Sequence, residues 1–332
     1  MDKIKFAIPK GSLEKATAEF FSKSGFKIGG TERTYRPSIN DPQIELKVLR
    51  PQEIPVFVSE GLQDLGITGE DWVKENRADV EVLQKLEYGK IGLVIAVPKS
   101  CENATIGELM ESIWSQGKNF RISTEYLNIA SDYVKSTPQY KKRFGDADPL
   151  IVTPWWRKGD NPKVKIFLSF GATEAKPPEN SDAIMDVTET GTTIEANNLK
   201  IIDTVLKSEA ILIANKKSME DPEKREKIHD ILALLKGVVD GSKRIHIFVN
   251  VKKVNLPKLL TELPALKNPT IAPLADEDWV SVNTVIEKDC LIELLPKIRK
   301  LAQGLVVYEP RQVLALDEIV KRDEKSCKGK AK

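Results

Sequence analysis

Apolar residues recur along the chain in two alternating patterns, which predict strands that are each followed by a helix. Lys3–Ile8 has the composition of a first strand, and apolar residues then recur at helical spacing from Leu13 to a natural stop at Gly25. The segment 65–69 predicts a short buried strand, and 91–97 is almost wholly apolar, as expected in a sheet covered on both faces. This alternation predicts an α/β layer whose functional loops follow the carboxyl ends of the strands.

A second α/β unit is predicted to follow. Its strands are expected at Phe120–Ser123, Val164–Leu168 and Ala183–Val187. Beyond them, Lys200–Leu206 and Ala210–Ala214 are expected to pair as antiparallel strands that return the chain to the first unit. Two crossings between the units predict two hinged lobes with a cleft between them.

From Asp221 onward the order of predicted elements changes. A helix that ends at Gly241 is followed by elements in β-α-β-β-α-β order, the ferredoxin-like or ACT-like pattern. This part carries no evident catalytic constellation, so it suits a regulatory or assembly module.

The chain is therefore expected to form three domains and a tail. We assign 1–97 together with 190–220 to the first lobe, and 98–189 to the second lobe. The regulatory domain is expected at 221–318. The charged residues 319–332 are expected to be a disordered tail.

The segment Asp182–Leu199 carries the strongest chemical signal. An apolar run leads into Asp186, a second carboxylate follows at Glu189, and next comes Thr190-Gly191-Thr192-Thr193. A Gly/Thr turn between a buried strand and a helix exposes backbone N–H groups that bind phosphate, and threonine hydroxyls add donors. The two carboxylates are placed to accept hydrogen bonds from vicinal ribose hydroxyls. This pattern indicates a site for a sugar 5-phosphate.

The same segment also has a purely structural interpretation, as the start of a helix. Thr192 and Glu195 have the spacing of a capping box, in which two side chains satisfy the first backbone N–H groups of a helix. Short motifs often match by chance, so the local string does not separate the two interpretations.

Composition narrows the class of protein. The chain has 332 residues, of which 41% are hydrophobic and 30% charged, with a formal net charge of +2. This balance argues against nucleic acid as a partner. Cys101, Cys290 and Cys327 indicate neither a disulfide framework nor a metal knuckle, and two histidines argue against a histidine-based metal site. No apolar run reaches membrane-spanning length, so we expect a cytoplasmic protein without a membrane partner.

Taken in order along the chain, several motifs resemble the long form of ATP phosphoribosyltransferase, the enzyme that opens histidine biosynthesis. The matching segments are IPKGSL at Ile8–Leu13, LRPQEIP at Leu49–Pro55, DLGITGEDW at Asp64–Trp72, RISTEY at Arg121–Tyr126, DAIMDVTETGTTIEANNL at Asp182–Leu199 and PALKNPTIAPLADEDWVSV at Pro264–Val282. The resemblance spans essentially the whole chain. It implies two lobes like those of periplasmic binding proteins, with the catalytic cleft between them, and a ferredoxin-like regulatory domain.

The resemblance also implies a reaction. N1 of the ATP adenine attacks the anomeric carbon of phosphoribosyl diphosphate (PRPP), and diphosphate leaves. By resemblance, Thr190, Gly191, Thr192 and Thr193 hold the 5-phosphate, while Asp186 and Glu189 hold the ribose hydroxyls or order the metal. Mg²⁺ is the implied cofactor, held mainly by the diphosphate and the ribose hydroxyls rather than by a dedicated set of protein ligands.

The ATP site is implied at turns that follow the first strands. The residues assigned to it are Lys10, Gly11, Arg50, Gly69, Glu70 and Asp71, and Lys10 is also a catalytic candidate. Each charged candidate has a structural alternative. Lys10 is otherwise a solvated turn lysine, Arg50 a member of a surface ion pair, and Asp71 the cap of its own helix.

For the last domain the resemblance implies histidine as an allosteric inhibitor and assembly into a homo-hexamer, with dimers as the alternative. Thr270 matches the effector-binding motif, and is otherwise an ordinary threonine at the start of a strand. The segment 140–162 looks longer and more charged than the family pattern, and Glu174–Pro178 carries an extra proline. Trp155-Trp156 is expected to pack beneath a long loop, with stacking on a base as the alternative.

Two rival functions remain at this point. A non-enzymatic two-lobed binding protein would leave the 186–193 segment unexplained and would lack the secretory segment of a periplasmic receptor. An amino-acid sensor that controls transcription would need a DNA-reading helix, and the sequence indicates none.

Overall fold

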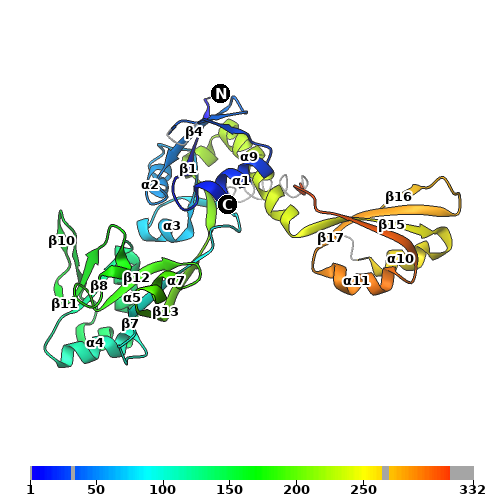
Figure 1. Cartoon of the computed structure of the whole chain (residues 1–332). Coiled ribbons are helices and arrows are strands. Elements are labelled where there is room, and N and C mark those ends of the chain that lie inside the picture. Colours follow the sequence, from blue (N-terminus) through cyan, green and yellow to red (C-terminus); the bar gives the residue numbers. More distant parts are fainter. Residues whose placement is uncertain (1, 31–33, 264–268, 315–332) are drawn as a thin grey trace, which may run out of the picture.

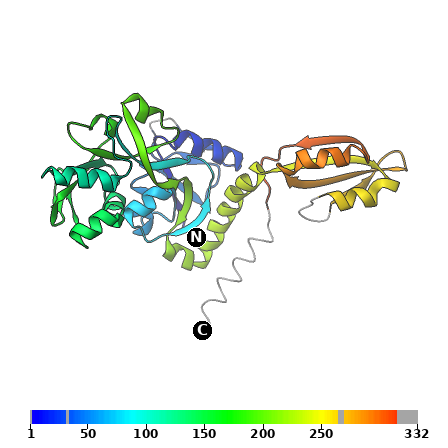
Figure 2. The ribbon, with the colours of Figure 1, turned by 90° about the horizontal axis from the view of Figure 1, so that it is seen from below.

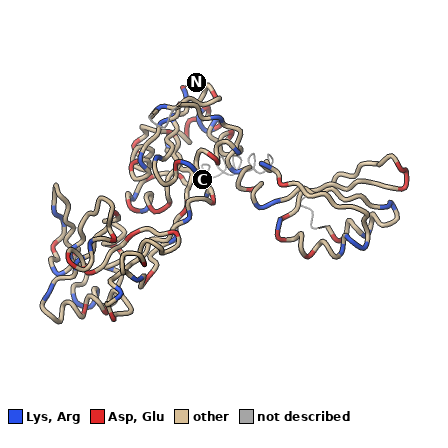
Figure 3. The backbone as a smooth tube through the Cα atoms, in the orientation of Figure 1, with Lys and Arg blue, Asp and Glu red and all other residues tan. Residues whose placement is uncertain are grey.

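The structure, a computed structural model, describes residues 2–30, 34–263 and 269–314. Figure 1 shows three bodies: two α/β lobes beside one another, and a third domain that extends away from them beyond helix α9. Figure 2 shows the same separation from below. Figure 3 shows acidic and basic residues interspersed over all three bodies.

The first lobe is built on a five-stranded sheet in the order β4-β1-β5-β14-β6. Its strands are β1 (Ile4–Pro9), β4 (Ile44–Leu49), β5 (Leu65–Gly69), β6 (Glu81–Lys85) and β14 (Ala210–Ala214), with a ribbon of β2 (Ile28–Gly29) and β3 (Ser38–Ile39) beside them. Its helices are α1 (Glu14–Lys23), α2 (Ile54–Ser59), α3 (Glu70–Asn76), α8 (Lys216–Glu220) and α9 (Pro222–Ser242). Strand β1 pairs in parallel with β4 and β5, whereas β14 runs antiparallel to β5 and β6. A Cβ on Gly66 would lie 2.4 Å from Ile54, so glycine there lets α2 pack closely on β5.

The second lobe is built on a seven-stranded sheet in the order β10-β9-β11-β8-β12-β7-β13. Its strands are β7 (Ile91–Pro98), β8 (Phe120–Thr124), β9 (Pro149–Val152), β10 (Arg157–Lys158), β11 (Asn161–Leu168), β12 (Ala183–Thr188) and β13 (Leu199–Ser208). Its helices are α4 (Ile106–Ser115), α5 (Leu127–Ser136), α6 (Pro138–Phe144) and α7 (Thr192–Ala196), with a 3₁₀ turn η1 (Thr173–Ala175). The parallel strands β8, β11 and β12 end at one edge of this sheet, which faces the first lobe.

The chain crosses between the lobes at positions that differ from the predicted boundaries. Strand β7 pairs with both β12 and β13, so 91–97 and 199–208 lie in the second lobe rather than in the first. The expected pairing of Lys200–Leu206 with Ala210–Ala214 is wrong, because β14 joins the other sheet. An apolar run marks a buried strand but does not state which of two sheets contains it.

The third domain has the predicted ferredoxin-like order. Its elements are β15 (Arg244–Lys252), η2 (Lys253–Asn255), α10 (Leu256–Glu262), β16 (Thr270–Pro273), β17 (Trp279–Glu287), α11 (Cys290–Ile298) and β18 (Ala302–Tyr308). The strands lie in the order β16-β17-β15-β18, and both longer helices pack on one face of the sheet. The predicted fold class of two α/β lobes and a ferredoxin-like domain is confirmed.

The third domain begins later in the chain than residue 221, where it was predicted to start. The apolar side of α9, which includes Ile231 and Leu235, belongs to the core of the first lobe, and the third sheet begins only at Arg244. After β18 the chain returns to α9, where Gln312 donates to the Leu234 carbonyl at 2.9 Å and Val313 to the Gly237 carbonyl at 2.9 Å. The predicted tail, 319–332, lies outside the described residues.

In the described part of the chain, no helix combines the length and the apolar character that a membrane crossing requires.

Candidate active site

A cavity of about 250 Å³ lies between the two lobes. Loops after β1, β4 and β5 form its first-lobe wall, and the edge of the second sheet forms the opposite wall. The residues on which the chemistry depends are Lys10, Gly11, Arg50 and Gly69 on the first wall, and Glu125 and Asp186 on the second. All of these residues except Glu125 belong to the substrate site predicted from the sequence, and the fold brings them to one cavity.

Lys10 and Arg50 supply the positive charge of the first wall. The Lys10 backbone N–H donates to the Leu49 carbonyl at 2.8 Å, and its ammonium lies 4.5 Å from the centre of the exposed Tyr35 ring. Gly11 has a φ of 91°, which favours glycine, and a Cβ there would lie 3.5 Å from the Arg50 guanidinium. Arg50 is exposed and forms no ion pair within the described ranges, so the surface-pair alternative does not hold.

Asp186 is the half-buried carboxylate of the second wall. It lies near the end of β12, where its Oδ1 accepts the Val187 N–H at 2.8 Å. Burial raises the pKa of Asp186 to about 6, with repulsion from Glu174 and Glu125 adding to the shift. The hydrogen bonds from the Val187 N–H and from the Thr173 side chain act in the opposite direction. This carboxyl is therefore ionised at neutral pH and protonates in mild acid.

Asp71 touches this cavity but makes contacts that the sequence analysis missed. It is 4% exposed, and its oxygens accept hydrogen bonds from the Ser208 hydroxyl at 2.5 Å and the Tyr126 hydroxyl at 2.6 Å. The helix-cap alternative is wrong, because the cap of α3 is Gly69 and no side chain caps that helix. A Cβ on Gly69 would lie 2.1 Å from the Asp71 carboxylate, so glycine leaves room for it. Burial, together with Asp71, holds the pKa of Tyr126 far above its usual range.

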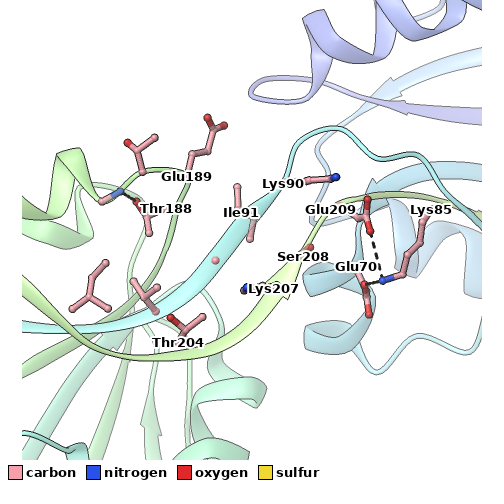
Figure 4. A pocket seen from close by; sticks show the side chains of 15 residues that line it. Glu70, Lys85, Lys90, Ile91, Thr188, Glu189, Thr204, Lys207, Ser208 and Glu209 are labelled. Carbon is pink, nitrogen blue, oxygen red and sulfur yellow. Dashed lines mark hydrogen bonds and ion pairs between the residues drawn. The ribbon is translucent and has the colours of Figure 1, made fainter. Parts of the chain in front are cut away.

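The predicted phosphate loop borders a neighbouring cavity of about 580 Å³, shown in Figure 4. Glu189, Thr190 and Gly191 line it from the second lobe, and Glu70 and Lys85 line it from the first. Ile91, on the crossing strand β7, borders both cavities. Asp186 and the loop therefore line two neighbouring cavities that share Ile91, rather than a single pocket.

Glu70 is engaged by lysines within this second cavity. Its carboxylate pairs with Lys85 at 2.9 Å and with Lys74 at 3.1 Å. Burial alone would raise the pKa of Glu70, but the hydrogen bonds from these lysines outweigh it and lower the pKa below its usual range. Glu70 and Asp71 were both predicted to line the ATP site. Both carboxylates already have partners, so neither is presented unpaired to Lys10 and Arg50.

The loop does not form the capping box that its sequence permits. The cap of α7 is Gly191, with a φ of 83°, and no side chain bonds to the first N–H groups of that helix. The Thr192 hydroxyl instead lies 2.8 Å from the Thr190 hydroxyl, and the Gly191 N–H donates to the Thr188 hydroxyl at 2.8 Å. Thr190, Thr192 and Thr193 are exposed. The hydroxyls are therefore presented to solvent rather than used to begin the helix.

Two other predicted features lie away from the cleft. Thr270 is exposed at the first position of β16 in the third domain. The expectation that Trp155-Trp156 packs beneath a loop is wrong, since Trp155 is 73% exposed and Trp156 is 45% exposed. The Trp155 ring makes a T-shaped contact with the Phe170 ring, with 5.7 Å between the centroids. The β9–β10 hairpin of 140–162 carries this pair outward from the lobe.

The carboxylates of the cavity wall bear on whether a divalent metal ion fits there. Across the described ranges, no three Asp, Glu, His or Cys side chains converge as metal ligands. Glu125 and Asp186 nevertheless provide carboxylate oxygens in the wall opposite Lys10, and oxygen is the donor that Mg²⁺ prefers. The residues fit an ion that arrives with a phosphorylated substrate and keeps most of its ligands from that substrate.

Together the fold and the site define a two-lobed α/β protein with a charged candidate site in the cavity between its lobes. A family model described as "ATP phosphoribosyltransferase" matches residues 50–237, and another described as "HisG, C-terminal domain" matches residues 242–311. The ATP phosphoribosyltransferase of Solibacter usitatus is 39% identical over 94% of this chain and 99% of its own length. That of Thermodesulfovibrio yellowstonii is 38% identical, with 94% and 98% covered. The chain therefore belongs to the ATP phosphoribosyltransferase family.

A solved structure supports the same assignment. It is titled "ATP phosphoribosyl transferase (HisG:HisZ) complex from Thermotoga maritima", is 25% identical, covers 71% of this chain and 98% of its own, and superposes with a TM-score of 0.54. The protein is accordingly a pentosyltransferase of the first step of histidine biosynthesis, with ATP and PRPP as substrates. Members of this family need a divalent metal ion. Membership sets aside the binding-protein and sensor alternatives.

Proposed function

We propose that ATP and PRPP bind on opposite walls of the interlobe cleft, so that closing the cleft brings N1 of adenine to the anomeric carbon of PRPP. The observation that supports this is the juxtaposition of Lys10 and Arg50, from one lobe, with Asp186 from the other across one cavity. A lysine and an arginine suit the triphosphate of ATP, and a carboxylate suits the ribose diol of PRPP. Gly11 lets the ATP phosphates approach the backbone, whereas Gly69 leaves room for the Asp71 carboxylate.

On the loop that follows β12, which borders the neighbouring cavity rather than the second wall itself, Thr190, Gly191, Thr192 and Thr193 hold the 5-phosphate of PRPP. The exposed hydroxyls of Thr190 and Thr192, 2.8 Å apart, form one donor pair that a phosphate oxygen can bridge. Glu189, on the same loop, holds the ribose from its other side. Glu70 and Asp71 are not proposed as direct ATP ligands, because their carboxylates already accept hydrogen bonds from neighbouring side chains.

The reaction needs position and charge more than proton transfer. Adenine N1 carries a lone pair and attacks unprotonated, so no general base is required. As the bond to diphosphate breaks, positive charge develops on the ribose ring, and the Asp186 carboxylate stabilises it while holding the hydroxyls in place. Lys10 faces the leaving diphosphate and balances the negative charge that gathers there. Glu125 would help to hold a Mg²⁺ ion that arrives with PRPP, and the ion would supply further neutralisation of the leaving group.

The third domain is proposed to bind histidine and to assemble the chains into hexamers. Thr270 is proposed to contact the effector, because it lies at the start of the edge strand β16. Its side chain is exposed there, so its hydroxyl can reach a ligand. Inhibition then requires histidine to favour a less active arrangement, by about 1–3 kcal/mol of coupling.

A direct assay tests the proposal. Purified protein is given ATP, PRPP and Mg²⁺, with and without histidine, and the product is identified by its ultraviolet absorbance and mass. The expected product is N1-(5-phosphoribosyl)-ATP, formed more slowly when histidine is present. Product formation that histidine leaves unchanged would contradict the proposed role of the third domain. Absence of product with both substrates bound would contradict the proposed cleft.

A further inference from the structure

Helix α3 of the first lobe lies against the amino-terminal end of α5 in the second lobe, beside the cleft. The Trp72 ring stacks on the Tyr126 ring with centroids 4.4 Å apart and an interplanar angle of 22°. Glu75, which is 7% exposed, accepts hydrogen bonds at 2.9 Å from the backbone N–H groups of Asn128 and Ile129. The lobes therefore touch through a packed contact in addition to the two crossing strands.

Asp71 links this contact to one of the crossings. It lies in α3 of the first lobe, Tyr126 immediately precedes α5 of the second lobe, and Ser208 is the last residue of the crossing strand β13. Tyr126 donates to one Asp71 oxygen at 2.6 Å and Ser208 to the other at 2.5 Å, while the Asp71 N–H donates to the Ser208 hydroxyl at 3.0 Å. We call these three residues the interlobe latch.

The latch is buried and fully hydrogen-bonded. Asp71, Tyr126 and Ser208 are 4%, 3% and 4% exposed, respectively. Buried hydrogen bonds to a carboxylate are among the stronger side-chain contacts, and they hold their partners in a narrow range of geometry. Each partner belongs to a different rigid element, so these bonds constrain how the elements sit relative to one another.

We propose that Asp71 is a positioning residue that, through Tyr126 and Ser208, sets the angle between the lobes and hence the gap across which the two substrates meet. The proposal rests on the substrate placement given above. Lys10 and Arg50 move with the first lobe and Asp186 with the second, so a change in the interlobe angle alters the distance between bound ATP and bound PRPP. Each lobe still binds its own substrate through its own residues.

Because each lobe binds its own substrate and the latch only aligns the two lobes, loss of the latch should affect kcat and KM differently. Loss of the latch lowers turnover, because reaction depends on the alignment of two bound substrates, and an error of about 1 Å can reduce a rate by as much as about 100-fold. It leaves the Michaelis constants nearly unchanged, because the contacts within each half-site remain. A residue that merely supported folding would change neither constant once the folded fraction was accounted for.

The test uses the full-length enzyme and Tyr126→Phe, which removes one hydroxyl but keeps the ring that stacks on Trp72. We expect kcat to fall about tenfold while the KM values for ATP and PRPP change by less than about twofold. The matched control is Tyr133→Phe. Tyr133 also donates to a carboxylate, that of Asp203, but both members of that pair lie in the second lobe. We expect this control to keep kcat within about twofold of the unaltered enzyme.

A second variant guards against a local effect of the tyrosine. Ser208→Ala removes the other hydrogen-bond partner of Asp71, and we expect the same split between kcat and KM. The double variant should lose less than the product of the two single losses, since both act through Asp71. An unchanged kcat in Tyr126→Phe, a fall equal to that of Tyr133→Phe, or a rise confined to one KM would overturn the proposal. An unaltered enzyme that makes no product would instead count against the proposed function.

Discussion

The role proposed for Asp186 can be tested by replacing it with asparagine, which keeps the shape and removes the charge. In the structure, Oδ1 accepts the Val187 N–H and the Thr173 side chain also bonds to the carboxyl, so the carboxylate keeps only part of its accepting capacity for the substrate. The change therefore removes about one charge-assisted hydrogen bond. A hydrogen bond to a charged group contributes about 1.5–3 kcal/mol, which corresponds to a loss of roughly 10- to 150-fold in kcat/KM for PRPP.

The pH dependence gives a sharper measure than the size of the loss. Because the pKa of Asp186 is raised to about 6, the free enzyme holds the carboxylate ionised above that pH and protonated below it. The protonated acid accepts hydrogen bonds from the ribose hydroxyls more weakly. The kcat/KM for PRPP of the unaltered enzyme should therefore fall as the pH drops through about 6, whereas asparagine has no such transition.

The assay measures kcat/KM for PRPP at saturating ATP from about pH 5 to about pH 9. The 5-phosphate of PRPP also titrates near pH 6, so the informative quantity is the ratio between enzyme and variant, in which the substrate's own titration cancels. That ratio should be large at high pH and should decrease toward one in acid. Glu174→Gln removes a repulsive neighbour and should move the transition to lower pH. A ratio that is constant with pH would refute the assignment of Asp186.

Three further predictions concern the loop and the core. Thr192→Ala should raise the KM for PRPP about two- to tenfold and leave the thermal midpoint unchanged, because one donor is lost from a hydroxyl that does not cap its helix. Gly191→Ala should raise the same KM, since a φ of 83° costs an alanine about 1–2 kcal/mol while the nearest atom to its Cβ lies at 3.7 Å. Asp64→Asn should lower the free energy of unfolding at pH 7 by about 1–3 kcal/mol, measured in urea, because Asp64 is buried and paired with Lys224 at 2.8 Å. Burial alone would raise the pKa of Asp64, but hydrogen bonds from Lys224, a serine hydroxyl and a backbone N–H lower it below 3.8. Its contribution is therefore complete above the unfolded pKa and disappears as the pH falls toward the folded pKa, so the variant and the unaltered protein should converge in acid.

The sequence predicted those features that depend on residues close together in the chain, such as strand ends, turns and the order of elements. Turns that follow strands placed Lys10 and Arg50, and the end of a strand placed Asp186, at sheet edges, and the β-α-β-β-α-β order of the last domain was confirmed. The sequence could not show which sheet a strand joins. The apolar pattern predicted β7 as a buried strand and 200–206 as a partner of 210–214, yet β7 and β13 pair with each other in the second lobe.

Contacts between segments that are far apart in the chain could not be predicted from the sequence either. Asp71 meets Ser208 across 137 positions and Tyr126 across 55, and no pattern within a short window encodes such a pairing. The string that contains Tyr126 was noticed as a family motif, but its hydroxyl was given no role. Trp155 was expected beneath a loop because aromatic residues are usually buried, and its exposure on a hairpin follows from tertiary structure alone.

Helix α9 holds both the chain that enters the third domain and the chain that leaves it. The domain's entry is the end of α9, and its exit, at Gln312 and Val313, is hydrogen-bonded back to the same helix. The apolar side of α9 is packed in the first-lobe core together with α1. A displacement of the third domain would therefore reach α9 directly and α1 through it, and α1 lies directly after the turn that carries Lys10 and Gly11.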